Sequence, residues 1–151
     1  MAREQRFPYV VTLVAVLVVV VALALGWRLI RGDSSILRNP TVADSIITPN
    51  ADGDQDITLI SYEISRNATV SIYFEDAAGE RYYFRREQPR GVGEYSVYFS
   101  GVVEGYELPG ESFDGQVLAR LLQNGDYSWV IEATDERGNQ DVAVGNLTIA
   151  G

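Results

Sequence analysis

The sequence predicts an all-β domain, an antiparallel β-sandwich of about seven strands, preceded by one N-terminal transmembrane helix. Three observations favour this fold class. Short runs in which apolar and polar residues alternate recur over residues 45–151, with turn-forming residues between them. A long apolar run lies near the N-terminus. Cysteine is absent, so the core of the sandwich must hold without a disulfide.

The apolar run near the N-terminus is long enough to cross a bilayer. Residues 7–27 form a segment of 21 residues, about 30 Å long as a helix, which matches the hydrocarbon core. We predict a tail over residues 1–6 and a membrane anchor over residues 7–27, with interfacial aromatic residues and small or polar residues for helix contacts. The residues assigned to these roles are Phe7, Tyr9, Thr12, Ala15, Ala22, Gly26 and Trp27.

An alternative for this segment is a cleavable signal peptide. Residues 22–24 read Ala-Leu-Ala, which suits cleavage and would release an exported domain. Arginines flank the segment on both sides, so the positive-inside rule gives little direct help. The short tail carries Arg3 and Arg6, and the larger domain is acidic. We therefore expect a single-pass protein of the cell membrane, with a cytoplasmic N-terminus and an extracytoplasmic domain.

The remainder of the chain divides into a linker and a sandwich. Residues 28–44 are rich in turn residues and lack a period, which predicts a linker, and the sandwich is expected over residues 45–151. Its predicted strands are residues 45–47, 57–65, 68–75, 81–86, 94–100, 127–134 and 141–149. The side chains expected to point inward are Ile60, Tyr62, Ile64, Val70, Ile72, Phe74, Tyr95, Val97, Phe99, Tyr127, Trp129, Ile131 and Ala133.

One hairpin register follows from the alternation. A loop centred on Ala78 places the large apolar residues of both strands on one face, whereas a slip by one residue mixes the faces. The expected pairs are Phe74 with Tyr82 and Ile72 with Phe84 on the inner face, and Tyr73 with Tyr83 on the outer face.

Four segments carry a family resemblance: ITPNADGDQDITLISYEIS, VSIYFEDAAGERYY, GVGEYSVYFSG and LLQNGDYSWVIEATDERGNQ, in this order. Over about residues 46–149 the chain resembles the immunoglobulin-like domain of flagellar hook-capping (FlgD-like) proteins, a domain also found in bacterial envelope and secreted proteins. Residues 124–127 and 135–139 match the turns of the family's last strands. Ala51 stands where the family has glycine, and the connection over residues 102–123 is longer than usual. The resemblance implies an immunoglobulin-like fold and a binding role rather than flagellar assembly.

The composition excludes much of enzyme chemistry. Histidine, cysteine and lysine are absent, all 12 basic residues are arginine, and the one methionine is Met1. These absences exclude catalytic triads with histidine, thiolate nucleophiles, iron–sulfur clusters, Schiff bases and a redox centre on this chain. The formal net charge of −9 disfavours nucleic acid. We expect a protein that is not an enzyme and has no cofactor, with calcium as the one alternative.

The calcium alternative rests on the stretch NADGDQD. Asn50, Asp52, Asp54 and Asp56 alternate there, and four side-chain oxygens within seven residues suit Ca²⁺. The glycine is misplaced for an EF-hand loop, and aspartate and asparagine also form turns unaided. A plain turn is therefore the other interpretation.

Two groups of residues are candidates for partner binding. On the predicted outer face, an arginine and tyrosine patch is expected from Tyr73, Arg81, Tyr83, Arg85, Arg86 and Arg90, residue types enriched at interface hot spots. An ordinary solvated strand face is the alternative. In the long connection, Asp114 is expected to cap a short helix. Its apolar residues either seal one end of the sandwich or form a docking ridge: Val117, Leu118, Leu121 and Leu122.

These expectations combine into a functional hypothesis. The chain is expected to be a non-catalytic membrane-anchored module that works by protein–protein contact, as an accessory subunit of a larger membrane or cell-envelope complex. Its partners would be other subunits, through the transmembrane helix and the sandwich, and the lipid bilayer. A glycan-binding or calcium-dependent envelope module and a cleaved exported domain are the alternatives.

Overall fold

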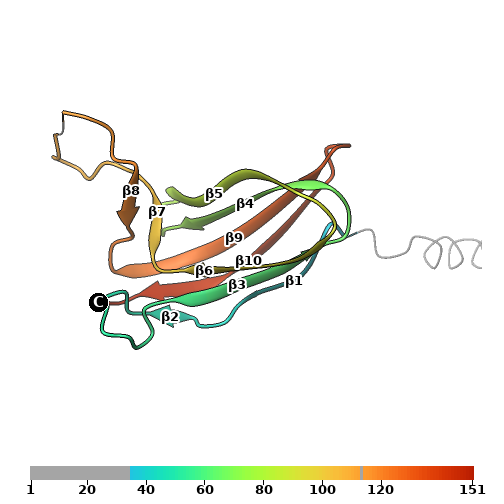
Figure 1. Cartoon of the computed structure of the whole chain (residues 1–151). Helices are drawn as coiled ribbons and strands as arrows, with labels where there is room; N and C mark the ends of the chain where they lie inside the picture. Colours follow the sequence, from blue (N-terminus) through green and yellow to red (C-terminus); the bar gives the residue numbers. More distant parts are fainter. Residues whose placement is uncertain (1–34, 113) are drawn as a thin grey trace, which may run out of the picture. The chain divides into compact units, whose positions relative to one another are not determined.

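The structure, a computed structural model, describes residues 35–112 and 114–151, which form ten strands (Figure 1). The predicted tail, the predicted membrane anchor and the first part of the predicted linker lie outside the described residues. No helix in the described part could span a membrane. The strands are β1 (Leu37–Val42), β2 (Ile46–Ile47), β3 (Thr58–Ile64), β4 (Ala68–Glu75), β5 (Arg81–Arg90), β6 (Gly93–Phe99), β7 (Val102–Glu104), β8 (Ala119–Leu121), β9 (Gly125–Asp135) and β10 (Gln140–Ile149).

Two sheets face each other across the core. One has three strands in the order β1-β3-β6, and the other has five in the order β2-β10-β9-β4-β5. β7 and β8 form a separate two-stranded ribbon. Neighbouring strands are antiparallel, except that β2 pairs in parallel with the end of β10. The all-β class and the sandwich arrangement are thereby confirmed.

The core lies where alternate side chains of the two sheets meet. Phe99 of β6 stacks on Phe74 of β4 with 4.2 Å between ring centroids, and it meets Phe84 of β5 edge-on at 5.0 Å. All the side chains predicted to point inward are buried or packed against this core. The period of two therefore assigned the inner faces correctly.

Residues 37–42 belong to the sheet, so the predicted linker over residues 28–44 is wrong there. The carboxylate of Asp141 on β10 accepts hydrogen bonds from the backbone N–H groups of Ile36 and Leu37. Ile36 is fully buried. The sandwich therefore begins at about residue 35 rather than at residue 45.

The three strands absent from the sequence prediction have separate causes. In β1, Asn39 adopts a left-handed φ of 48° before Pro40, and the register against β3 shifts at this point. Such a bulge interrupts the alternation by which a strand is identified. β7 and β8 have three residues each, which is too short for an alternation of apolar and polar residues to be recognised.

The hairpin of β4 and β5 follows the predicted register only near its loop. Ile72 lies opposite Arg85 rather than Phe84, because β5 is bulged on both sides of this pair. Phe84 still points inward, as its contact with Phe99 shows. The confirmed pairs are Phe74 with Tyr82 and Tyr73 with Tyr83.

The helix predicted to begin at Asp114 is wrong, because this connection folds back as the β7–β8 ribbon. Of its four apolar residues, Leu122 alone is buried at the end of the sandwich. Leu118 is 79% exposed, Leu121 is exposed, and Val117 is half-buried. The apolar spacing suits a helix and a ribbon equally, so it could not separate the two.

The geometry of the ribbon depends on a close backbone approach and an ion pair. The N–H of Gly105 donates to the carbonyl oxygen of Leu118 at 3.1 Å, and a Cβ on Gly105 would lie 1.6 Å from the carbonyl oxygen of Val117. Arg120 forms an ion pair with Glu111, with its two terminal nitrogens at 3.0 and 2.6 Å from the carboxylate. The connection is therefore an ordered structure in the described part.

Gly145 of β10 provides a test of the packing. It lies under the indole ring of Trp129, its cross-strand partner, and a Cβ there would lie 2.3 Å from the ring. We expect Gly145→Ala to lower the free energy of unfolding in urea by about 1–3 kcal/mol, because overpacking displaces the ring. Gly91→Ala is the control, since its Cβ would meet only Asn67 at 3.8 Å, and it should cost less than about 0.5 kcal/mol. Equal losses of unfolding free energy in the two variants would contradict the close packing of Trp129 on Gly145.

Candidate functional site

The outer face of the five-stranded sheet carries a continuous row of aromatic and aliphatic side chains. Tyr83 of β5 lies opposite Tyr73 of β4, which lies opposite Val130 of β9. Val130 in turn lies opposite Val144 of β10. Tyr73 is only 4% exposed and Val130 is also buried, although both face away from the core. The outer face therefore has a packed cluster of its own.

Two arginines cover this cluster on the β5 side. The guanidinium of Arg81 lies 4.7 Å from the ring centroid of Tyr73, and that of Arg86 lies 3.7 Å from the centroid of Tyr83. Arg81 also pairs with Glu75 at 3.2 Å, and Arg86 pairs with Glu104 at 3.0 Å. Burial raises the pKa of Tyr73, and the charge of Arg81 opposes this rise. We call Tyr73, Arg81, Tyr83 and Arg86 the arginine–tyrosine surface.

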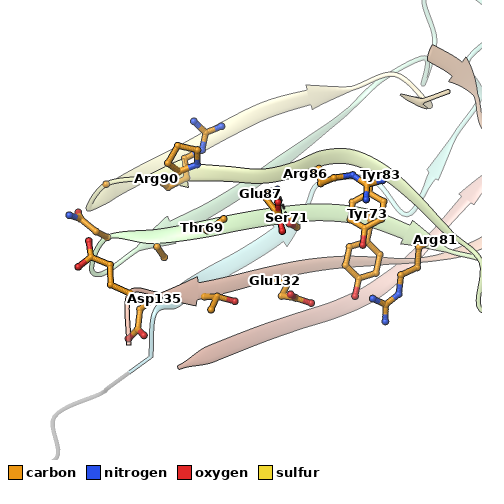
Figure 2. Close-up of a pocket in the computed structure, with 16 residues that line it drawn as sticks. Thr69, Ser71, Tyr73, Arg81, Tyr83, Arg86, Glu87, Arg90, Glu132 and Asp135 are labelled. Carbon is orange, nitrogen blue, oxygen red and sulfur yellow. Dashed lines mark hydrogen bonds between the residues drawn. The ribbon is translucent and has the colours of Figure 1, made fainter. Parts of the chain in front are cut away.

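An open groove of about 800 Å³ runs along this face. Figure 2 shows Arg81, Tyr73 and Tyr83 at one end of the groove and Asp135 at the other. Glu132 lines it from β9. The groove thus has Arg81, Arg86 and Arg90 along β5, with Glu87 among them, and Glu132 and Asp135 along β9.

Two of the arginines expected in the patch make contacts outside the arginine–tyrosine surface. Arg85 is turned by the bulge in β5, and its guanidinium lies 4.3 Å from the ring centroid of Phe84. Arg90 donates from Nε to the hydroxyl of Tyr62 at 3.3 Å, and its guanidinium lies over Tyr95. Since Tyr62 and Tyr95 belong to the other sheet, Arg90 links the two sheets, and it also lines the end of the groove away from Arg81 (Figure 2).

Sequence reasoning missed the β9 and β10 side of this face. Glu132 and Val130 on β9, and Val142 and Val144 on β10, share the outer face with Tyr73. For β9 the signal was present, because Val130 and Glu132 alternate with the inward positions already assigned. What the sequence alone does not provide is the strand order that places β10 beside β9 and β9 beside β4.

Asp135 at the end of the groove is a structural residue. Its carboxylate accepts four hydrogen bonds of 2.9 Å, from Asn139 Nδ2, the backbone N–H groups of Asn139 and Arg137, and Arg66 Nε. The amide of Asn139 contributes most, and together these donors outweigh desolvation and lower the pKa of Asp135 to about 2. The side chain thereby joins the β9–β10 turn to the β3–β4 loop.

The predicted calcium residues form a network of turns. Both carboxylate oxygens of Asp56 accept backbone N–H groups, from Asn50 and Ala51 on one oxygen and from Gly53 on the other. The hydrogen bond from Gly53, followed by those from Ala51 and Asn50, lowers the pKa of Asp56 against the effect of desolvation. Asn50 and Asp52 accept the N–H groups of Asp52 and Asp54 in the same way.

This loop therefore has the geometry of the plain turn. Within the described ranges, no three Asp, Glu, His or Cys side chains are grouped so that they could hold a metal ion. The carboxylate of Asp56 already has donors on both oxygens, and displacing them would cost the loop its hydrogen bonds. Calcium binding at Asn50, Asp52, Asp54 and Asp56 remains a prediction from the sequence, and the titration below tests it.

The lowered pKa of Asp135 predicts a pH dependence of stability. Since the folded pKa of about 2 lies below the unfolded value of about 3.9, the stabilisation is complete above pH 4 and is lost as the pH falls towards 2. We expect Asp135→Asn to flatten this part of the profile. Asn139→Ala removes the largest cause of the lowered pKa, so the loss of stability should be smaller and should end at a higher pH. Urea midpoints measured between pH 2 and 6 report both effects. If the midpoint changes equally with pH in the native protein and in both variants, Asp135 does not cause this pH dependence.

The calcium titration has a matched pair of variants. We expect added Ca²⁺ to leave the thermal midpoint of the chain unchanged. Asp56→Ala should lower the midpoint equally with and without Ca²⁺, because the turn loses the carboxylate that accepts its N–H groups. Asp54→Ala should have little effect, since its side chain accepts no hydrogen bond from the described residues. A thermal midpoint that rises with Ca²⁺ in the native chain, but in neither variant, would show a metal site.

No protein-family model matches this chain, and no curated protein sequence matches it. Among solved structures, the chain is similar to the PmoD soluble domain from Methylocystis sp. ATCC 49242 (Rockwell). The likeness has 13% sequence identity and a TM-score of 0.41, and it covers 79% of this chain and 100% of that chain. The resemblance to the hook-capping family stays a prediction, and the functional proposal rests on the residues of this chain.

Proposed function

We propose that this chain is a non-catalytic accessory module whose immunoglobulin-like sandwich binds a partner protein of a membrane or cell-envelope complex. Residues 7–27 would anchor it in the cell membrane, with the N-terminus in the cytoplasm and the sandwich outside. The observation that carries the proposal is the arginine–tyrosine surface, which lies beside an open groove on the outer face of the sheet.

The strand order supports the immunoglobulin-like assignment. In that fold the first, second and fifth main strands share one sheet, and the third, sixth and seventh share the other. Here β1, β3 and β6 form one sheet, while β4, β9 and β10 are neighbours in the other.

The arginine–tyrosine surface has the composition and rigidity of a binding site. Arginine and tyrosine are enriched at interface hot spots. Glu75 and Glu104 hold the two guanidinium groups in place before any partner arrives. Side chains that are already ordered lose less conformational entropy on binding, which favours affinity. These contacts support protein binding over an ordinary solvated face.

The same contacts count against the glycan alternative. A glycan module stacks sugar rings on open aromatic faces. In the groove, Arg81 covers one face of Tyr73 and Arg86 covers one face of Tyr83. Tyr73 is also buried. A partner that offers carboxylates and flat apolar groups suits this surface better than a sugar.

The double variant Arg81→Ala/Arg86→Ala tests this surface. The full chain is purified in mild detergent from its native cells, and the proteins that accompany it are identified and quantified by mass spectrometry. Loss of two hot-spot side chains should reduce the co-purifying partner about tenfold or more. The chain itself should stay in the membrane fraction, since the anchor is unchanged.

Arg85→Ala is the matched control. Arg85 is exposed on the same strand but lies over Phe84, outside the arginine–tyrosine surface, so this variant should retain the partner. Equal retention by the double variant would refute binding at this surface. Migration of the native chain alone, as a monomer, would refute the accessory-subunit proposal.

A further inference from the structure

The five-stranded sheet has one edge that no described strand covers over most of its length. β10 pairs with β9 along all ten of its residues. On its other side β2 pairs only with Thr148 and Ile149. Residues 140–147 therefore have a neighbouring strand on one side alone, at the edge opposite β5 (Figure 1).

The backbone groups at this edge point outward and are regularly spaced. The N–H of Thr148 donates to Ser45 and that of Ala150 to Ile47, both on the side away from β9. Because these directions alternate along an antiparallel strand, the N–H and C=O groups of Val142, Val144 and Asn146 point to the same side. None of these three has a backbone partner on that side within the described residues.

The side chains along this edge are aliphatic and exposed. Val142 is 53% exposed and Val144 is 61% exposed, both on the outer face of the sheet. Val144 continues the row that runs through Val130 and Tyr73. An added strand would therefore extend an existing apolar row and would bury the two valines.

The opposite edge of the same sheet is protected against strand addition. β5 contains two bulges, a left-handed Glu87 and Pro89, and it carries arginines. Natural proteins block sheet edges with these devices. β10 pairs with β9 without a bulge, contains no proline, and has Asp141 as its one charged residue. The edges of the other sheet are also unlike it, since β1 has Pro40 in a bulge and β6 presents Glu94, Ser96 and Tyr98 outward.

Charge decides between a second copy of this chain and a different partner. β9 and β10 contain four acidic residues and no basic residue. Glu132 lies on the outer face opposite Val142, and no hydrogen bond or ion pair is present for it in the described part of the chain. A second copy would bring the same acidic strands, whereas a basic segment would complement them. The distance from β9 to an added strand is two strand spacings, about 10 Å, which arginine and glutamate side chains span together.

We infer that the edge of β10 over residues 140–147 binds an extended segment of a partner protein that presents aliphatic and basic side chains on the same face, at every second position. The segment adds to the sheet as a further strand, its backbone pairing with Val142, Val144 and Asn146. Its aliphatic side chains pack on the two valines, and a basic side chain reaches Glu132. This contact uses Glu132, which also lines the groove, but none of the four residues of the arginine–tyrosine surface.

Amide hydrogen exchange of the full chain in detergent, followed by NMR, tests the inference. The probe is a synthetic eight-residue peptide of sequence Val-Thr-Val-Thr-Arg-Thr-Val-Thr, which places valine and arginine on one face of the added strand, compared with one that has glutamate in place of arginine. At ten times its Kd, the arginine peptide should slow exchange at Val142, Val144 and Asn146 about tenfold. The glutamate peptide should leave exchange unchanged. No protection at these amides, or equal protection by both peptides, would overturn the inference.

Two variants separate strand addition from other binding. Val144→Pro removes one outward N–H at an edge position that tolerates proline, and Val144→Arg keeps the N–H but adds a repelling charge. Each substitution should raise the Kd of the arginine peptide at least about tenfold. Val92→Arg is the matched control, since Val92 is 69% exposed in the β5–β6 turn, and it should bind normally. Normal binding by both Val144 variants would overturn the inference. Arg81→Ala/Arg86→Ala should also bind normally, which keeps this result independent of the proposed function.

Discussion

The contact of Phe99 with Phe74 and Phe84 is the interaction on which the rest of the sandwich depends. These rings join the two sheets in a chain that has no cysteine to join them. Because Phe84 must point inward in a bulged strand, the residues after it are turned. Arg85 lies over Phe84, while Arg86 is brought back to the outer face over Tyr83. Packing of the core therefore determines which arginines reach the arginine–tyrosine surface.

Alternation in the sequence predicted the fold class, the inner faces and most strands, because a half-buried strand repeats every two residues. It failed where a local backbone feature broke the period, as at Asn39 in β1 and at the bulges of β5. It also failed in the long connection, where the contact of Gly105 with the backbone of Val117 is a pairing between residues distant in sequence. No local pattern encodes such a pairing.

The candidate site was predictable to the extent that it follows from one hairpin. The pairing of Tyr73 with Tyr83 placed Arg81 beside them, and the structure has all three together. Arg90 lines the groove at its other end, and its long side chain also reaches Tyr62 of the other sheet. The valines of β10 were missed because their role depends on which strand lies at the edge, a property of topology rather than of local sequence.

The charge distribution implies that the two surfaces recognise different groups. The loops over residues 48–57, 76–80 and 105–118 all lie at the end of the sandwich away from residue 35, and they contain acidic residues and no arginine. A basic segment approaching the molecule is attracted to this end and to the acidic β9 and β10 strands, whereas the arginines of β5 repel it. An acidic or apolar partner surface instead favours the arginines of β5 over the acidic β9 and β10 strands. One ligand cannot satisfy both, so a protein that engages both surfaces must present two chemically distinct elements, and variants at Arg81 and at Val144 should report on them separately.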